Sequence, residues 1–108
     1  MSERRIASYP AVLEKQVNGE YCVNIPDLND LATFGTDYND AMDMAVDAMA
    51  GYLFELKKDG EILPAPSDPA SFSLTDGEFV SMVSVDVDEY VNKVFNKAVK
   101  NQSRFQNG

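Results

Sequence analysis

Short, mainly apolar stretches bounded by polar and turn-forming residues recur along the chain, a pattern that is typical of β-strands. Three such stretches lie in the first third of the sequence, and a fourth, rich in β-branched residues, lies further along the chain. The pattern predicts strands over Ile6–Lys15, Glu20–Ile25, Leu31–Gly35 and Glu78–Val87, and in the second of these Tyr21, Val23 and Ile25 share one face.

Four residues refine the prediction for the first two strands. Asn18-Gly19 lies between them and is a strong signal for a β-hairpin. Pro10 has no backbone N–H, so the first strand is expected to be an edge strand or to contain a bulge. Cys22 lies within the second strand and is expected to be a small buried hydrophobic residue.

Between the third and fourth strands the apolar residues recur at the spacing of one face of an α-helix. They are Ala41, Met42, Ala45, Ala48, Met49, Tyr52, Leu53 and Leu56. Thr36 or Asp37 is suited to cap the start of this helix, and Asp59-Gly60 is suited to end it. The pattern predicts a helix over about residues 37–59.

The order of the predicted elements is β-β-β-α-β, which indicates an α+β fold with two layers. One long helix covers one face of a mainly antiparallel sheet. Its apolar side is expected to pack against Val12, Tyr21, Val23, Ile25, Val83 and Val85. Residues 1–92 form this domain, with a proline-rich loop over Glu61–Ser71. A basic tail over residues 93–108 follows, which begins as a short helix or is irregular.

The charge of the chain is unevenly distributed. The net charge is −9, but all 18 acidic residues lie at or before Glu89, where only five basic residues accompany them and the sum is −13. From Tyr90 onward there are four basic and no acidic residues, which gives +4. An acidic body repels the phosphates of nucleic acids and suits a basic protein partner.

Composition excludes several classes of function. The chain has no histidine, so a Ser-His-Asp triad and histidine metal ligation are excluded. Its single cysteine cannot form a disulfide within the chain, and no apolar run approaches the ~20 residues that cross a bilayer. We expect a cytoplasmic protein without a cofactor and without a membrane-spanning segment.

Two groups of carboxylates are candidates for function. Asp40, Asp43 and Asp47 lie on one face of the predicted helix, together with Phe54, and form either a solvated face or a docking surface. Asp27 and Asp30 follow Pro26 in a corner that ends the second strand, where a turn explains them without a function. A less favoured alternative joins this corner to Asp86 and Asp88 in a divalent metal site.

Five segments, taken in order, resemble the HicB antitoxin family. They are "YPAVLEK", "GEYCVNIPDL", "TFGTDYNDAMDMAVDAMAGYL", "GEILPAPS" and "VDVDEY", within about Ile6–Lys100. The resemblance implies a compact, partial ribonuclease-H-like βββαβ domain. It also implies that the protein neutralises a HicA-like toxin, a small basic protein that cleaves mRNA with a histidine.

The end of the chain departs from the family pattern. Family members usually continue into a ribbon-helix-helix or helix-turn-helix module that dimerises and binds DNA. Here "NKAVKN", Asn96 to Asn101, resembles the linker to that module, and "QSRFQNG" has no room for it. We therefore expect no sequence-specific DNA binding by this chain alone, while a homo-oligomer remains possible.

These observations favour a non-enzymatic antitoxin of a type II toxin–antitoxin pair, which binds and occludes a basic toxin. Two alternatives rank below it: a stand-alone RNA-binding regulatory domain, and a metal-dependent nuclease. The hypothetical partner-binding residues are the carboxylates Asp27, Asp30, Asp40, Asp43 and Asp47 and the aromatic anchors Tyr9, Phe34 and Phe54.

Overall fold

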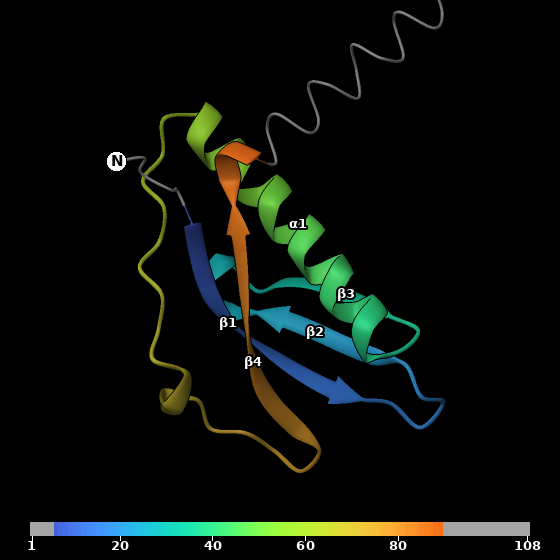
Figure 1. The fold of residues 1–108 in the computed structure, drawn as a ribbon. Helices are drawn as coiled ribbons and strands as arrows, with labels where there is room; N and C mark the ends of the chain where they lie inside the picture. The colour runs from blue at the N-terminus through green and yellow to red at the C-terminus, as the bar shows by residue number, and fades with distance from the viewer. Residues whose placement is uncertain (1–5, 90–108) are drawn as a thin grey trace, which may run out of the picture.

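The computed structural model of the chain describes residues 6–89; residues 1–5 and 90–108 lie outside this range. The described part is a four-stranded antiparallel sheet with one long helix on one of its faces (Figure 1). The strands are β1 (Ile6–Lys15), β2 (Tyr21–Ile25), β3 (Leu31–Gly35) and β4 (Glu78–Asp86), and the helix is α1 (Tyr38–Lys58). Two short 3-10 helices, η1 (Pro26–Leu28) and η2 (Pro69–Ser71), interrupt the loops. The predicted βββαβ order and two-layer α+β fold are confirmed.

The predicted basic tail over residues 93–108 lies outside the described residues, and so does most of the predicted C-terminal helix. Residues 87–89 are helical, and the backbone N–H of Glu89 donates a 3.1 Å hydrogen bond to the Asp86 side chain. None of the helices among residues 6–89 combines the length and the apolar character needed to cross a membrane.

Pro10 lies in a central strand, so the expectation of an edge strand or a bulge is wrong. The strand order is β3-β2-β1-β4, and β1 pairs with β4 without interruption from Ile6↔Asp86 to Glu14↔Glu78. The pairing of β1 with β2 begins only at Val12↔Asn24, because β2 turns into η1 at Pro26. At Pro10 only β4 pairs with β1, so a missing N–H is tolerated on the other side.

The core lies between α1 and the face of the sheet that it covers. Fully buried α1 residues pack against buried residues of β1, β2 and β4: Ala41, Ala45, Met49 and Leu53 against Tyr9, Ala11, Leu13, Val23, Ile25 and Val83. The predicted apolar stripe of the helix is therefore confirmed, with Met42, Tyr52 and Leu56 partly buried at its border, except at Ala48, which is only half-buried and is not part of this core. Val12 was expected in this core, but it pairs with Asn24 and lies on the opposite face of the sheet.

The sheet face opposite α1 is partly open. Cys22 pairs with Phe34 on this face, and both side chains are exposed. The expectation of a buried Cys22 is wrong because the side chains of a strand alternate between the faces, and α1 covers the face of Val23.

A reciprocal pair of hydrogen bonds, a variant of the capping box, fixes the start of α1. The backbone N–H of Asp40 donates to the side chain of the N-cap residue Asp37 at 2.8 Å, and the Asp40 carboxylate accepts from the backbone N–H of Thr36 at 2.9 Å. The first bond satisfies an N–H group that the first turn of a helix leaves free, and the second holds the residue before the N-cap against that turn. They also place a negative charge at the positive end of the helix dipole.

Gly35 allows the end of β3 to touch the first turn of α1. A Cβ atom at this position would overlap the backbone of Ala41 and lie 2.7 Å from the carbonyl carbon of Asp40. No other residue type fits there without moving the helix. The junction therefore sets the position of α1 over the sheet.

The long segment between α1 and β4 runs alongside β1 (Figure 1) and is held at two points. The Asp27 carboxylate accepts from the backbone N–H of Ser67 at 2.7 Å and from its hydroxyl at 2.6 Å. The Tyr9 hydroxyl donates to the backbone carbonyl of Pro64 at 2.6 Å. Burial, and secondarily the charge of Asp27, raise the pKa of the Tyr9 hydroxyl above its ordinary value of 10.0.

The central position of Leu53 gives a first test. Its side chain is 0% exposed, so Leu53→Ala is expected to lower the free energy of unfolding by roughly 2–5 kcal/mol through lost burial and the cavity left behind. Met44→Ala changes a 42% exposed residue of the same helix and should cost far less. Urea denaturation followed by circular dichroism measures both. Equal losses in the two variants would contradict the burial described here.

Tyr9→Phe tests the anchor of the long segment. At pH 7 the variant is expected to lose about 0.5–1.5 kcal/mol of unfolding free energy, because the Pro64 carbonyl loses its donor. The folded state holds the Tyr9 proton more tightly than the unfolded chain, so this contribution is complete below pH 10 and is lost as the pH rises through the raised pKa. Above about pH 10 the stability of Tyr9→Phe should therefore fall less steeply than that of the parent chain. Parallel curves above that pH would overturn the assignment.

Candidate binding groove between α1 and β4

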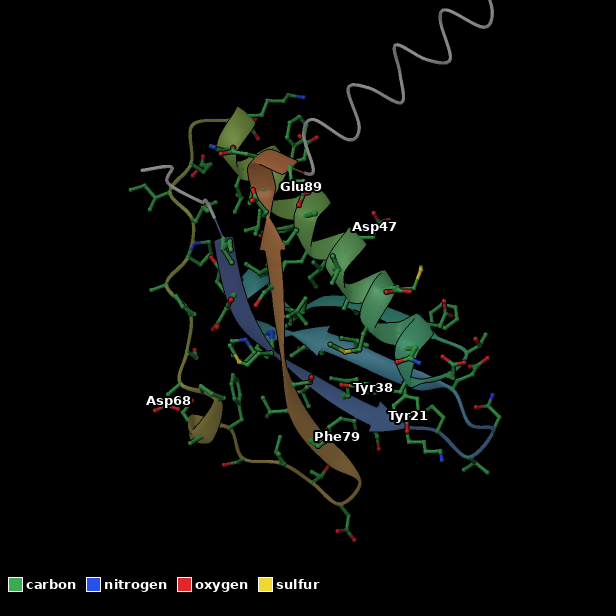
Figure 2. The ribbon with its side chains drawn as sticks, in the orientation of Figure 1. Tyr21, Tyr38, Asp47, Asp68, Phe79 and Glu89 are labelled. Atoms are coloured by element: carbon green, nitrogen blue, oxygen red, sulfur yellow. The ribbon has the colours of Figure 1, made fainter. Side chains whose placement is uncertain are left out.

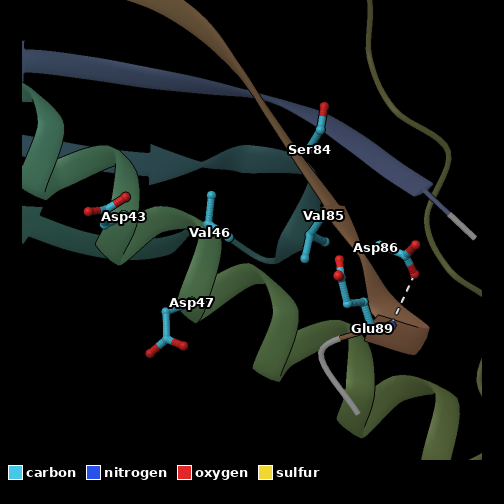
Figure 3. A pocket seen from close by; sticks show the side chains of 7 residues that line it. All are labelled: Asp43, Val46, Asp47, Ser84, Val85, Asp86 and Glu89. Atoms are coloured by element: carbon cyan, nitrogen blue, oxygen red, sulfur yellow. Dashed lines mark hydrogen bonds between the residues drawn. The ribbon is translucent and has the colours of Figure 1, made fainter. Parts of the chain in front are cut away.

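Helix α1 runs in the same direction as β4, and a groove lies between them. At the start of the helix the Tyr38 hydroxyl lies 3.2 Å from the Ser81 hydroxyl, and near its end the Lys57 ammonium lies 3.3 Å from Asp88. Between these contacts is a hollow of about 420 Å³ (Figure 3). It is lined by Asp43, Val46, Asp47, Ser84, Val85, Asp86 and Glu89. We call it the α1–β4 groove.

Four of the seven residues that line the groove are acidic, and none is basic. Asp43 and Asp47 come from successive turns of α1, while Asp86 and Glu89 come from the end of β4 and the turn after it. Val46 and Val85 supply an apolar floor between the two rows of carboxylates. In Figure 3 the four carboxylates are spread along the walls and do not converge on one point. Such a surface suits an extended basic partner better than a single small cation.

An aromatic cluster lies at the end of the groove where α1 begins. Tyr21, Tyr38 and Phe79 have ring centroids 5.8–6.3 Å apart, with Tyr21 edge-on to the other two rings (Figure 2). Tyr38 and Phe79 remain 39% and 37% exposed. The sequence does not reveal this cluster, because β2, α1 and β4 each contribute one ring and only the fold brings them together.

The three acidic residues predicted to form one row on the helix, Asp40, Asp43 and Asp47, do not all lie in the groove. Asp43 and Asp47 line the groove, but the Asp40 carboxylate is used to cap α1. Asp86 and Glu89, which the sequence did not assign to partner binding, complete the groove. The sequence gives no signal for Asp86 and Glu89 as site residues, because their role depends on β4 lying beside the side of the helix that carries Asp43 and Asp47.

The Pro-Asp corner lies away from the groove. Asp27 holds Ser67 in place, so its carboxylate has a structural partner. Asp30 is exposed and has a left-handed backbone, with φ of 56°. Neither residue lines the groove, and the corner is explained by chain geometry.

The three predicted aromatic anchors have different environments. Tyr9 is only 3% exposed and belongs to the core, so the expectation of a surface anchor is wrong: its side chain points toward the face that α1 covers. Phe34 is 58% exposed but lies on the opposite face of the sheet. Phe54 is half-buried on α1, on the same side of the helix as Asp43 and Asp47.

The carboxylates of the alternative metal site have separate roles. Asp27 binds Ser67, Asp86 accepts from the Glu89 N–H, and Asp88 forms an ion pair with Lys57. Within residues 6–89, no three His, Cys, Asp or Glu side chains are grouped in a way that would hold a metal ion. The geometry of this part of the chain therefore does not support the alternative of a metal-dependent nuclease.

Comparisons with known proteins agree with this fold. The family model of the HicB-like antitoxin of bacterial toxin–antitoxin systems matches residues 9–102. No curated protein matches the chain. Among solved structures, the chain is similar to one in a toxin–antitoxin complex from Streptococcus pneumoniae, with 30% identity and a TM-score of 0.72 over 79% of this chain and 72% of the other.

Two further structures are similar. One is a chain of a HicA3 and HicB3 toxin–antitoxin complex, with 25% identity and a TM-score of 0.55 over 70% of this chain and 94% of the other. The second is the N-terminal domain of the antitoxin HicB from Burkholderia pseudomallei, with a TM-score of 0.64 over 74% of this chain and 99% of the other; at 24% identity it supports the fold alone. The family model covers most of the chain, and this chain therefore belongs to the HicB-like antitoxin family of bacterial toxin–antitoxin systems.

Proposed function

We propose that this HicB-like antitoxin binds a basic, HicA-like mRNA-cleaving toxin in the α1–β4 groove and blocks its access to RNA. The observation that carries the proposal is the lining of the groove, which has four carboxylates and no basic residue. This chain is similar to chains from two toxin–antitoxin complexes, one of which is a HicA3 and HicB3 complex, and this similarity supports a toxin as the partner.

In this proposal charge sets the association rate, and apolar contacts set the dissociation rate. The negative potential of the groove steers a basic partner toward it and raises the association rate. The exposed rings of Tyr38 and Phe79, at one end of the same groove, are suited to be the apolar anchors that slow dissociation. Phe54 is a third candidate anchor, on the helix side that carries Asp43 and Asp47.

The proposed neutralisation is steric and needs no chemistry by the antitoxin. A toxin that cleaves RNA must leave its own basic surface free for phosphates. The carboxylates of the groove would compete for that surface. Phe34, Asp27 and Asp30 lie off the groove and have no role in this proposal.

Charge reversal in the groove tests the proposal. In Asp43→Lys/Asp47→Lys the association rate with the HicA-like toxin partner is expected to fall about tenfold or more at low salt, and the salt dependence of that rate to weaken. Asp40 is left unchanged, because its carboxylate caps the helix. Stopped-flow or surface plasmon resonance measurements at several salt concentrations give both quantities.

A matched control makes the same change in net charge elsewhere. Glu14→Lys/Glu55→Lys alters two exposed positions outside the groove and is expected to change the rate by less than about threefold. If both double variants bind and neutralise the toxin as well as the parent chain does, the groove is not the toxin site.

The absence of catalysis is tested separately. The purified chain is expected to cleave neither RNA nor DNA with Mg²⁺ or Mn²⁺, because Asp86 accepts from the Glu89 N–H and Asp88 pairs with Lys57, and the two carboxylates do not converge with others on one metal site among residues 6–89. The measurement is the turnover of fluorescent RNA and DNA substrates. Cleavage that Asp86→Asn/Asp88→Asn abolishes would contradict a purely binding role.

A further inference from the structure

Strand β4 has an open edge along the α1–β4 groove. It is the last strand in the order β3-β2-β1-β4, and no described strand pairs with its outer side. In Figure 1 it lies in front of the other strands. Its sequence from Glu78 to Asp86, "EFVSMVSVD", has no Lys or Pro, which often protect an edge from pairing with another chain, and its only charged residues stand at its two ends.

The hydrogen-bond pattern identifies the backbone groups that β4 presents at this edge. The Gln16 N–H donates to the Glu20 carbonyl at 2.7 Å, so Gln16 points toward β2. Backbone groups alternate sides along a strand, so the odd-numbered residues of β1 point toward β4. Tyr9↔Val83 and its equivalents are therefore the hydrogen-bonded pairs of the β1–β4 ladder.

The even-numbered residues of β4 consequently direct their backbone N–H and C=O groups outward. The N–H of Glu78 is already used, because it donates to the Thr75 carbonyl at 3.1 Å. The others are Val80, Met82, Ser84 and Asp86, and the last two also line the groove. The acidic side chains and the unpaired backbone thus belong to one continuous surface, with Asp43 and Asp47 on one wall and the free ladder of β4 along the other.

We infer that a basic β-strand of the toxin pairs with the open edge of β4 and extends the sheet to five strands. This inference rests on the proposed function and adds the mode of recognition. Main-chain hydrogen bonds to β4 would supply the register, and alternate side chains of the added strand would face α1. Among the residues of that strand that face α1, basic ones would then meet Asp43 and Asp47, and an apolar one would lie over Val46 and Val85.

Charge argues against a second copy of this chain as the occupant. Each copy would bring the four carboxylates of its groove to the shared edge, and the described part of β4 contributes no basic residue to offset them. Like charges placed together across an interface are unfavourable. A basic strand avoids that repulsion.

Amide hydrogen exchange of the complex tests the inference without any mutation. On addition of the toxin, the amides of Val80, Met82, Ser84 and Asp86 are expected to exchange at least about tenfold more slowly. The same alternation places the amides of Ala32 and Phe34 at the other open edge, on β3, and these serve as an internal control that should not change. If a complex forms while the four β4 amides exchange at their free rates, strand pairing is wrong and the groove can still be the toxin site.

A pair of variants at Met82 separates the backbone from the side chain. Met82→Pro removes one outward N–H and is expected to weaken toxin binding at least about tenfold, whereas Met82→Ala keeps the N–H and removes a 44% exposed side chain, with a change below about threefold. Circular dichroism reports whether Met82→Pro folds; if it does not, the exchange experiment decides. Equal binding by folded Met82→Pro and Met82→Ala would overturn the inference.

Amide exchange of the chain alone, measured over a range of concentrations, tests whether a second copy of the chain occupies the β4 edge. Slower exchange of the four β4 amides as the concentration rises would place a second copy at the edge and contradict a basic toxin strand. If no complex with the toxin forms at all, the proposed function fails before the question of strand pairing arises.

Discussion

The burial of one face of α1 against one face of the sheet is the interaction on which the rest of the structure depends. Met49 and Leu53 lie at its centre, in contact with a core that includes Val23, Ile25 and Val83. Complete burial of such side chains contributes about 1.5–3 kcal/mol each, more than an exposed ion pair usually does. A single helix cannot also cover the opposite face, and the sheet has only four strands. Within residues 6–89 the sheet therefore keeps one partly open face and two edges that no described strand pairs with.

The direction of α1 creates a second requirement. Because α1 and β4 run the same way, the chain must return along the length of the sheet before β4 can begin. The segment between Lys58 and Glu78 makes this return, and Asp27 and Tyr9 hold it through Ser67 and Pro64. The Pro-Asp corner after β2 is thus part of the route that brings β4 to its place beside β1. A carboxylate that resembles a functional group in the sequence has a structural purpose here.

The same arrangement produces the candidate site. With β4 at the edge and α1 beside it, two helix carboxylates and two from the end of the strand border one groove. The three acidic residues of the helix row are not equivalent, because Asp40 is committed to the helix cap while Asp43 and Asp47 face the groove. Negative charge and an unpaired strand edge coincide on this surface. Such a combination is suited to bind a basic protein, because charge attracts it and the edge offers backbone hydrogen bonds.

The sequence by itself determined the features that depend on neighbours along the chain. Apolar runs between turn-forming residues marked the four strands, helical spacing marked the face of α1 that holds Leu53, and Asn18-Gly19 marked the hairpin. The segment motifs indicated the antitoxin family that the family model shows. Only the tertiary structure decided which strand is central, that Tyr9 is buried, and that Asp43 and Asp47 share a groove with Asp86 and Glu89. The physical reason is that periodicity and capping act over a few residues. Strand order and helix placement instead bring together side chains about forty positions apart, through a core that no single segment forms alone.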